Sequence, residues 1–134
     1  MNSNSYDVKR RDVDLLKFQL VSNLEFGEIA LLQGNYKMAE KVYEEALTIL
    51  LELKGKLNGE DFKKLKNIVV NGLEHTYTST LIDKSGVESY FKFEKLLRDK
   101  NNPLVREYDE KNKKLDGWVK ILDNISPNYS EFIS

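Results

Sequence analysis

The most constraining feature of this sequence is the recurrence of apolar residues at intervals of three and four. The pattern runs from Val13 to Leu32, resumes from Lys37 to about Lys56, and returns from Phe62 to about Asp83. An α-helix turns once in 3.6 residues, so this interval forms one apolar stripe that faces a core. The alternation typical of strands does not extend over any length of the chain. The sequence therefore predicts an all-α fold.

Capping residues and glycines mark the ends of the first three helices. Asp12 is the predicted N-cap of the first helix, because its carboxylate can accept hydrogen bonds from the backbone amides of the first turn. Gly34 follows the last apolar position of that helix, where glycine commonly ends helices. Asn58 and Gly59 separate the second helix from the third. Gly72 lies inside the third helix, where it costs about 1 kcal/mol relative to Ala, so we expect it to permit a close helix crossing.

The last third of the chain predicts two more helices. Ser85-Gly86-Val87-Glu88 has the form of a capping box, in which two side chains bond each other's backbone amides, and predicts a fourth helix that ends near Lys100. Asn102-Pro103 supplies the N-cap and first position of a fifth helix, which we expect to end at Pro127. The polar run over 109–114 leaves open whether the fifth helix is continuous.

The length of 134 residues predicts a single helical domain over 1–134, with a flexible N-terminus over 1–11 and a C-terminal tail over 126–134. The 21 basic and 22 acidic residues give a net charge of −1, so no bulk charge favours nucleic acid or an anionic membrane as a partner. No segment has the roughly 18 consecutive apolar residues of a membrane span, and the N-terminus lacks the apolar run of a signal peptide. These features predict a cytoplasmic protein that binds no nucleic acid and does not span a membrane.

Few residues could carry catalytic or metal chemistry. The chain has no Cys, and His75 is its single His, so neither a thiolate nucleophile nor an imidazole metal cluster can form. Glu74 with His75 is the one modest candidate pair for acid–base catalysis, although His75 lies off the apolar stripe of its helix, as a solvated surface residue does. The sequence thus predicts a non-enzymatic protein without a metal or cofactor. A hydrolase or transferase that uses carboxylates alone is the alternative of another class.

One window of about 30 residues, from Asn23 to Leu51, combines small and aromatic residues in a distinctive order. The residues are Phe26, Gly27, Ala30, Gly34-Asn35-Tyr36, Ala39, Tyr43 and Ala46. This pattern resembles a tetratricopeptide repeat, in which a small residue lets two helices of a hairpin approach and an aromatic residue fills the gap between them. The resemblance implies antiparallel helical hairpins in a right-handed array or bundle. Helices one and two would then pair, as would helices three and four, and the fifth helix would bury Trp118, Leu122 and Ile125 as it closes the open edge.

The same window also resembles the hairpin of a microtubule-interacting and transport domain, a three-helix module that binds short motifs of membrane-remodelling proteins. That resemblance covers residues 12–83, and it implies a peptide bound between the second and third helices. A plain helical bundle, in which the small and aromatic residues simply pack, is the third alternative.

The repeat-like resemblance implies an interaction module or adaptor that holds a peptide or helix of a partner protein in a groove between helix pairs. In that family the first helix of each pair lines the concave side, which assigns Glu28, Asn71, Glu74 and Thr78 to the partner-binding surface. The two acids favour a basic or amphipathic partner. Formation of a homo-oligomer stays open.

Overall fold

The computed structural model describes the backbone of residues 2–133 and the side chains of residues 12–124. The described backbone contains five helices and no strand. The helices are α1 (Asn2–Leu32), α2 (Tyr36–Leu53), α3 (Gly59–Ser85), α4 (Tyr90–Leu97) and α5 (Pro103–Ile133). The predicted all-α class is confirmed.

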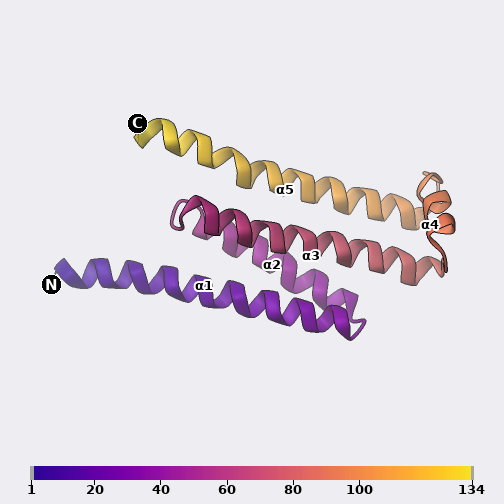
Figure 1. The fold of residues 1–134 in the computed structure, drawn as a ribbon, viewed down its shortest axis with the longest axis horizontal. Helices are drawn as coiled ribbons and strands as arrows, with labels where there is room; N and C mark the ends of the chain where they lie inside the picture. The colour runs from indigo at the N-terminus through magenta and orange to yellow at the C-terminus, as the bar shows by residue number, and fades with distance from the viewer. Residues whose placement is uncertain (1, 134) are drawn as a thin grey trace.

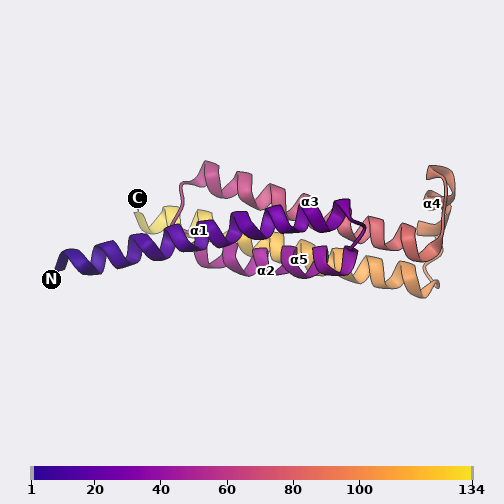
Figure 2. The same cartoon turned by 90° about the horizontal axis from the view of Figure 1, so that it is seen from below.

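Four long helices, α1, α2, α3 and α5, lie side by side, and α4 lies at the end of the molecule where α3 finishes and α5 begins (Figures 1 and 2). Because the connections between α1, α2 and α3 are short, consecutive helices run in opposite directions. Helix α2 packs against both α1 and α3, and α5 packs mainly against α3.

The predicted pairing of the third and fourth helices is wrong, because α3 pairs with α5 instead. Helix α4 has only eight residues and none of them is buried, so it cannot cover the apolar stripe of the 27-residue α3. The longer α5 covers that stripe with Val105, Leu115 and Leu122, all buried. The first predicted pair, α1 with α2, is confirmed.

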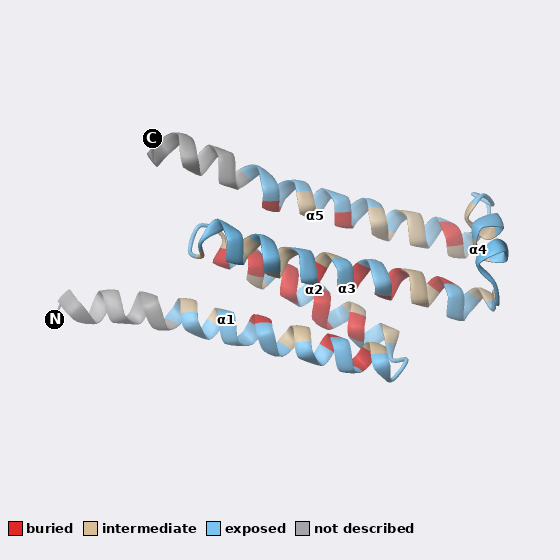
Figure 3. Ribbon diagram, viewed as in Figure 1, coloured by how far each residue is buried: buried red, intermediate tan, exposed pale blue. Residues whose placement is uncertain are grey.

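Helix α2 supplies the centre of the core. Its predicted stripe is buried throughout, at Ala39, Val42, Tyr43, Ala46, Leu50 and Leu53, and Leu47 is buried beside it (Figure 3). Leu20 of α1, Leu73 of α3 and Leu122 of α5 are buried in the same cluster. Trp118 is half-buried against it, and Ile125 lies outside the described side chains.

The Tyr43 ring lies between the backbones of α1 and α3. A Cβ atom at Gly27 would lie 2.7 Å from Tyr43 Cζ, and one at Gly72 would lie 2.5 Å from the same atom. Both distances are shorter than real Cβ contacts, so only glycine fits at either position with the ring in place. The close approach predicted at Gly72 is confirmed.

Three predicted helix boundaries are also confirmed. Gly34 has a positive φ of 73° at the end of α1. The side chain of Asn58 accepts a hydrogen bond from the Asp61 amide at 2.8 Å, and the side chain of Asn102 accepts one from the Leu104 amide at 2.9 Å.

Two other boundaries were predicted wrongly. Asp12 lies inside α1, which begins at Asn2, and is therefore not an N-cap. Ser85 is the last residue of α3, because Gly86 with a φ of 70° ends that helix. Ser89 caps α4 instead, since its hydroxyl oxygen accepts a hydrogen bond from the Lys92 amide at 3.2 Å.

Helix α5 is continuous across 109–114 and does not end at Pro127. The predicted flexible N-terminus over 1–11 and C-terminal tail over 126–134 fall outside the described side chains.

Candidate functional site

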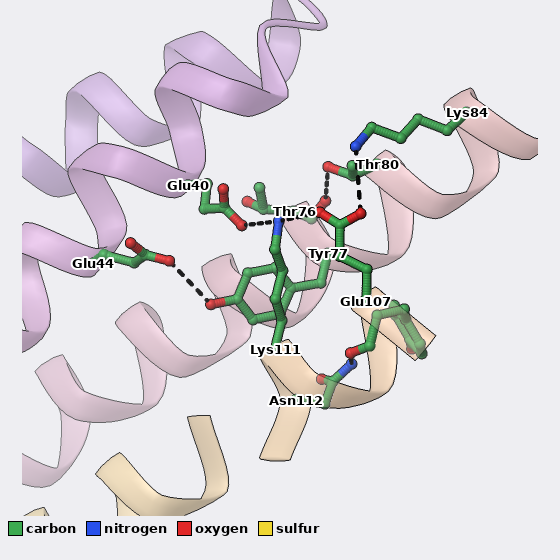
Figure 4. Close-up of polar contacts among 10 residues, drawn as sticks. Glu40, Glu44, Thr76, Tyr77, Thr80, Lys84, Glu107, Lys111 and Asn112 are labelled. Atoms are coloured by element: carbon green, nitrogen blue, oxygen red, sulfur yellow. Dashed lines mark hydrogen bonds and ion pairs between the residues drawn. The ribbon is translucent and has the colours of Figure 1, made fainter. Parts of the chain in front are cut away.

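A charged groove follows the seam between α2 and α5, with α3 as its floor. It contains two hollows, of about 480 Å³ and about 390 Å³, and both are lined by Glu40 of α2 and Lys111 of α5. These two side chains meet across the groove from α2 and α5 and so bridge it (Figure 4). Because both hollows share them, the pair divides the groove. We call this feature the α2/α5 groove.

Each hollow has its own chemical character. The larger one lies toward the α1–α2 turn and is bordered mostly by polar and charged residues, namely Gly34, Asn35, Tyr36, Lys37, Glu40, Thr80, Asp83, Lys84, Glu107 and Lys111. The smaller one adds apolar and aromatic side chains, and its lining is Glu40, Glu44, Leu47, Thr48, Tyr77, Lys111, Lys114, Leu115 and Trp118. A peptide lying across the Glu40–Lys111 pair would therefore contact charged side chains in one hollow and the aromatic side chains of Tyr77 and Trp118 in the other.

The bridge is an ion-pair network centred on the Lys111 ammonium group. Its Nζ atom lies 2.6 Å from Glu40 Oε1, 3.3 Å from Glu107 Oε1, and 5.8 Å from the centre of the Tyr77 ring. The last distance is within the range of a cation–π contact. Burial alone would lower the pKa of Lys111, but the hydrogen bonds and charges of Glu40 and Glu107 outweigh it and raise the pKa. Lys111 therefore stays charged and compensates the acids around it.

Glu44 stands at the rim of the smaller hollow without a comparable partner. The Tyr77 hydroxyl donates to Glu44 Oε1 across a long 3.5 Å, and no ion pair of Glu44 occurs among the described residues. Although Glu44 as a whole is exposed, partial burial of its carboxylate, and then the negative charge of Glu40, raise its pKa, while Lys111, Tyr77 and Lys114 lower it. The groove thus holds one carboxylate whose charged form is only partly stabilised.

Tyr77 lies at the floor of the groove, where its ring faces Lys111 and its hydroxyl donates to Glu44. Burial, together with the charges of Glu44 and Glu40 and the hydrogen bond to Glu44, raises the pKa of Tyr77 strongly. Its hydroxyl therefore stays protonated and remains a hydrogen-bond donor toward the groove.

The four predicted partner-binding residues do not line the α2/α5 groove. Glu28, Asn71 and Glu74 are exposed. Glu28, on α1, makes no hydrogen bond or ion pair with the other three, which lie on α3. The half-buried Thr78 has its hydroxyl 3.4 Å from that of Tyr108, so it takes part in the α3–α5 contact. The candidate catalytic residue His75 is exposed, like its neighbour Glu74.

Sequence reasoning missed the residues that form the groove. Lys111 belongs to a basic run, Lys111-Asn112-Lys113-Lys114, which reads as a solvated face; in the structure Lys111 itself is half-buried. The one local signal is that Glu107 and Lys111 are four residues apart, a spacing that brings their side chains together on a helix. The partnership with Glu40 depends on how α2 and α5 dock.

Among the described residues, no group of acids and histidines could hold a metal ion, and no helix is long and apolar enough to cross a membrane. Comparison with protein-family models, with curated proteins and with solved structures finds no match for this chain.

Proposed function

We propose that this protein is a non-catalytic interaction module that binds a peptide segment of a partner protein in the α2/α5 groove. The observation that carries the proposal is the groove itself, a pair of hollows between two long helices with Glu44 exposed at its rim and unpaired among the described residues. A peptide, being long and narrow, fits such a groove better than a compact metabolite does.

The charge of the groove favours a peptide that carries Lys or Arg. A cationic side chain placed at Glu44 would pair with a carboxylate whose charged form is only partly stabilised, and it would lower the raised pKa of that group. Because the Tyr77 hydroxyl and the half-buried Trp118 flank the same hollow, an apolar or aromatic residue next to the cation would also find a partner surface. The sequence also led us to expect a basic or amphipathic partner, but on the basis of Glu28 and Glu74, which do not line this groove.

The arrangement of the helices favours this groove over the seam between α2 and α3. Helix α1 and helix α5 both contact α2 and α3, and they lie on opposite sides of that pair (Figure 1). A motif that bound between α2 and α3, as in a microtubule-interacting and transport domain, would have to displace one of these helices. The exposed positions of Glu74 and His75 likewise support a binding protein over a carboxylate-based enzyme.

Selection of random displayed peptides on the full chain tests the proposal. We expect the selected peptides to carry a Lys or Arg beside an apolar residue, and Glu44→Lys to weaken their binding by about tenfold or more, because a close charge pair becomes a repulsion. Glu45→Lys is the matched control, since Glu45 is exposed on the same helix and does not line the groove.

Two outcomes would place the partner elsewhere. Equal binding of the peptides to Glu44→Lys and to the unchanged chain, with helicity intact, would rule out the α2/α5 groove. If the double variant Glu28→Lys and Glu74→Lys abolished binding instead, the partner would bind the surface that the repeat-like resemblance implies.

A further inference from the structure

The outer side of α1 carries an apolar stripe that no side chain among residues 12–124 covers. Six large apolar side chains on this helix are between 45% and 82% exposed, namely Leu15, Phe18, Val21, Phe26, Ile29 and Leu32. They lie opposite the positions of α1 that face the core, such as Leu20 and Gly27. Helix α1 forms the outer edge of the bundle, and its outward side is exposed along the described part (Figures 1 and 3).

The stripe is larger than an ordinary surface requires. It extends along about 25 Å of helix, and its six side chains expose several hundred square ångströms of apolar surface. The largest apolar patch on a typical monomer covers roughly 300–600 Å² and often marks an interaction site. Removing the stripe from water is therefore favourable, and the order of its residues indicates which molecule binds to it.

The stripe is symmetric along its length. Leu15 and Leu32, Phe18 and Ile29, and Val21 and Phe26 form three pairs that share one midpoint, between Asn23 and Leu24. The two polar residues within the stripe, Ser22 and Glu25, share the same midpoint. Two copies of α1 that cross antiparallel at this point would bring each apolar residue level with an apolar residue of the other copy. Ser22 would then lie level with the partner's Glu25, whose carboxylate can accept a hydrogen bond from the serine hydroxyl.

The charges beside the stripe are also complementary to a second copy. Lys17 and Glu28 lie on the same edge of the stripe by helical spacing, and in an antiparallel two-fold pair each edge faces its own counterpart. In the register set by the shared midpoint, Lys17 would lie within about 3 Å along the axis of the level of the partner's Glu28. The two-fold symmetry axis produces the same Lys17–Glu28 pair at the other end of the contact.

We propose that the α1 stripe is a homodimer interface in which two copies of this chain pack antiparallel about a two-fold axis near Asn23 and Leu24. Standard interfaces bury roughly 800 Å² per partner and weaker ones bury less, so a contact along a single helix is expected to lie at the small end of that range. The interface lies on the opposite side of α1 from the core, away from the α2/α5 groove, so its failure would leave the proposed peptide binding untouched.

The molar mass of the full chain in solution is the first test. We expect a dimer, twice the 15.6 kDa of one copy. The double variant Phe18→Gln and Ile29→Gln should convert it to a monomer while the helicity stays unchanged. Gln keeps helix propensity while removing the apolar contact. Phe91→Gln is the matched control, because Phe91 on α4 is 77% exposed, as against 71% for Phe18, and its loss should leave the dimer intact.

A monomeric mass at about 100 μM, where any contact with a micromolar Kd is formed, would overturn the proposal. A double variant that dimerised as well as the unchanged chain would overturn it too.

Disulfide trapping tests the antiparallel register, and the absence of native Cys makes single thiols unambiguous. Two Phe18→Cys copies would hold their thiols roughly 16 Å apart along the axis, too far to bond. Phe18→Cys should therefore cross-link with Ile29→Cys in a mixture, and neither variant should cross-link with itself. Cross-linking of each variant only with itself would indicate a parallel pair, and no cross-link in any mixture would likewise rule out the proposed register.

Discussion

Tyr43 and Gly72 fix the distance between α2 and α3, since a Cβ at Gly72 would lie 2.5 Å from the Tyr43 ring atom Cζ. Gly72→Ala should therefore destabilise the fold by about 1–3 kcal/mol through overpacking, despite the better helix propensity of Ala. Gly117→Ala is the control, because nothing lies near a Cβ there, and it should stabilise the protein by up to about 1 kcal/mol. Urea unfolding measures both changes. A stable Gly72→Ala variant would mean that the ring is not held against α3.

The Lys111–Glu40 bridge should contribute measurably to stability. The two side chains are 28% and 24% exposed, so Lys111→Met would leave a largely desolvated carboxylate without its counter-charge. We expect a loss of about 1–2 kcal/mol, smaller than for a fully buried pair because water still reaches the groove. The double variant Lys111→Met and Glu40→Leu should recover much of that loss in denaturant unfolding. Additive effects of the two substitutions would contradict a direct pair.

Glu44 should give the protein a specific pH dependence. Its pKa in the folded chain is raised above the ordinary 4.5, chiefly by burial and then by Glu40, so the folded state binds a proton more tightly than the unfolded state does. The contribution of Glu44 to stability must therefore fall as the pH rises from the ordinary value through the folded one.

The unfolding free energies of the unchanged chain and of Glu44→Gln, compared between about pH 4 and about pH 7, isolate this contribution from that of the other acids. We expect the unchanged chain to lose stability relative to Glu44→Gln as the pH increases. A constant difference across that range would mean that the groove does not perturb the carboxyl group. Tyr77→Phe should raise the pKa of Glu44 further, since it removes a hydrogen bond that lowers it.

Two adjacent residues of α5 differ in burial and should differ in their effect on stability. Leu122 is 1% exposed and Ile121 is 50% exposed. Leu122→Ala should cost about 2–5 kcal/mol, because it leaves a cavity in the core, whereas Ile121→Ala should change stability by less than about 1 kcal/mol. Thermal melts of the two variants measure the contrast. Similar melting temperatures would mean that α5 does not dock in the observed register.

The sequence predicts the part of the fold that depends on local pattern. The stripe of α2, the end of α1 at Gly34 and the close approach at Gly72 all follow from spacing and from the special properties of glycine. The fourth helix was predicted to start too early, because Ser85 and Glu88 match a capping box locally, whereas Gly86 ends α3 between them.

The groove could not be predicted, because it depends on contacts between distant segments. Glu40 and Lys111 lie on helices that are not adjacent in the sequence, since α3 and α4 come between them, and no local periodicity brings them together. The pairing of α3 with α5 instead of α4 has the same origin. It depends on which helix buries more apolar surface, and that comparison requires the assembled bundle.

Because no residue of α4 is buried, the connection over 86–102 joins two bodies that are held together by other means. The contact between α3 and α5 would persist if the backbone were cut within α4. We therefore expect that a chain cut there into two fragments, one with α1–α3 and one with α5, reassembles without a covalent link. If each fragment carried half of a split reporter protein, the reporter signal would measure their association. A foreign domain inserted into α4 should likewise leave the bundle intact.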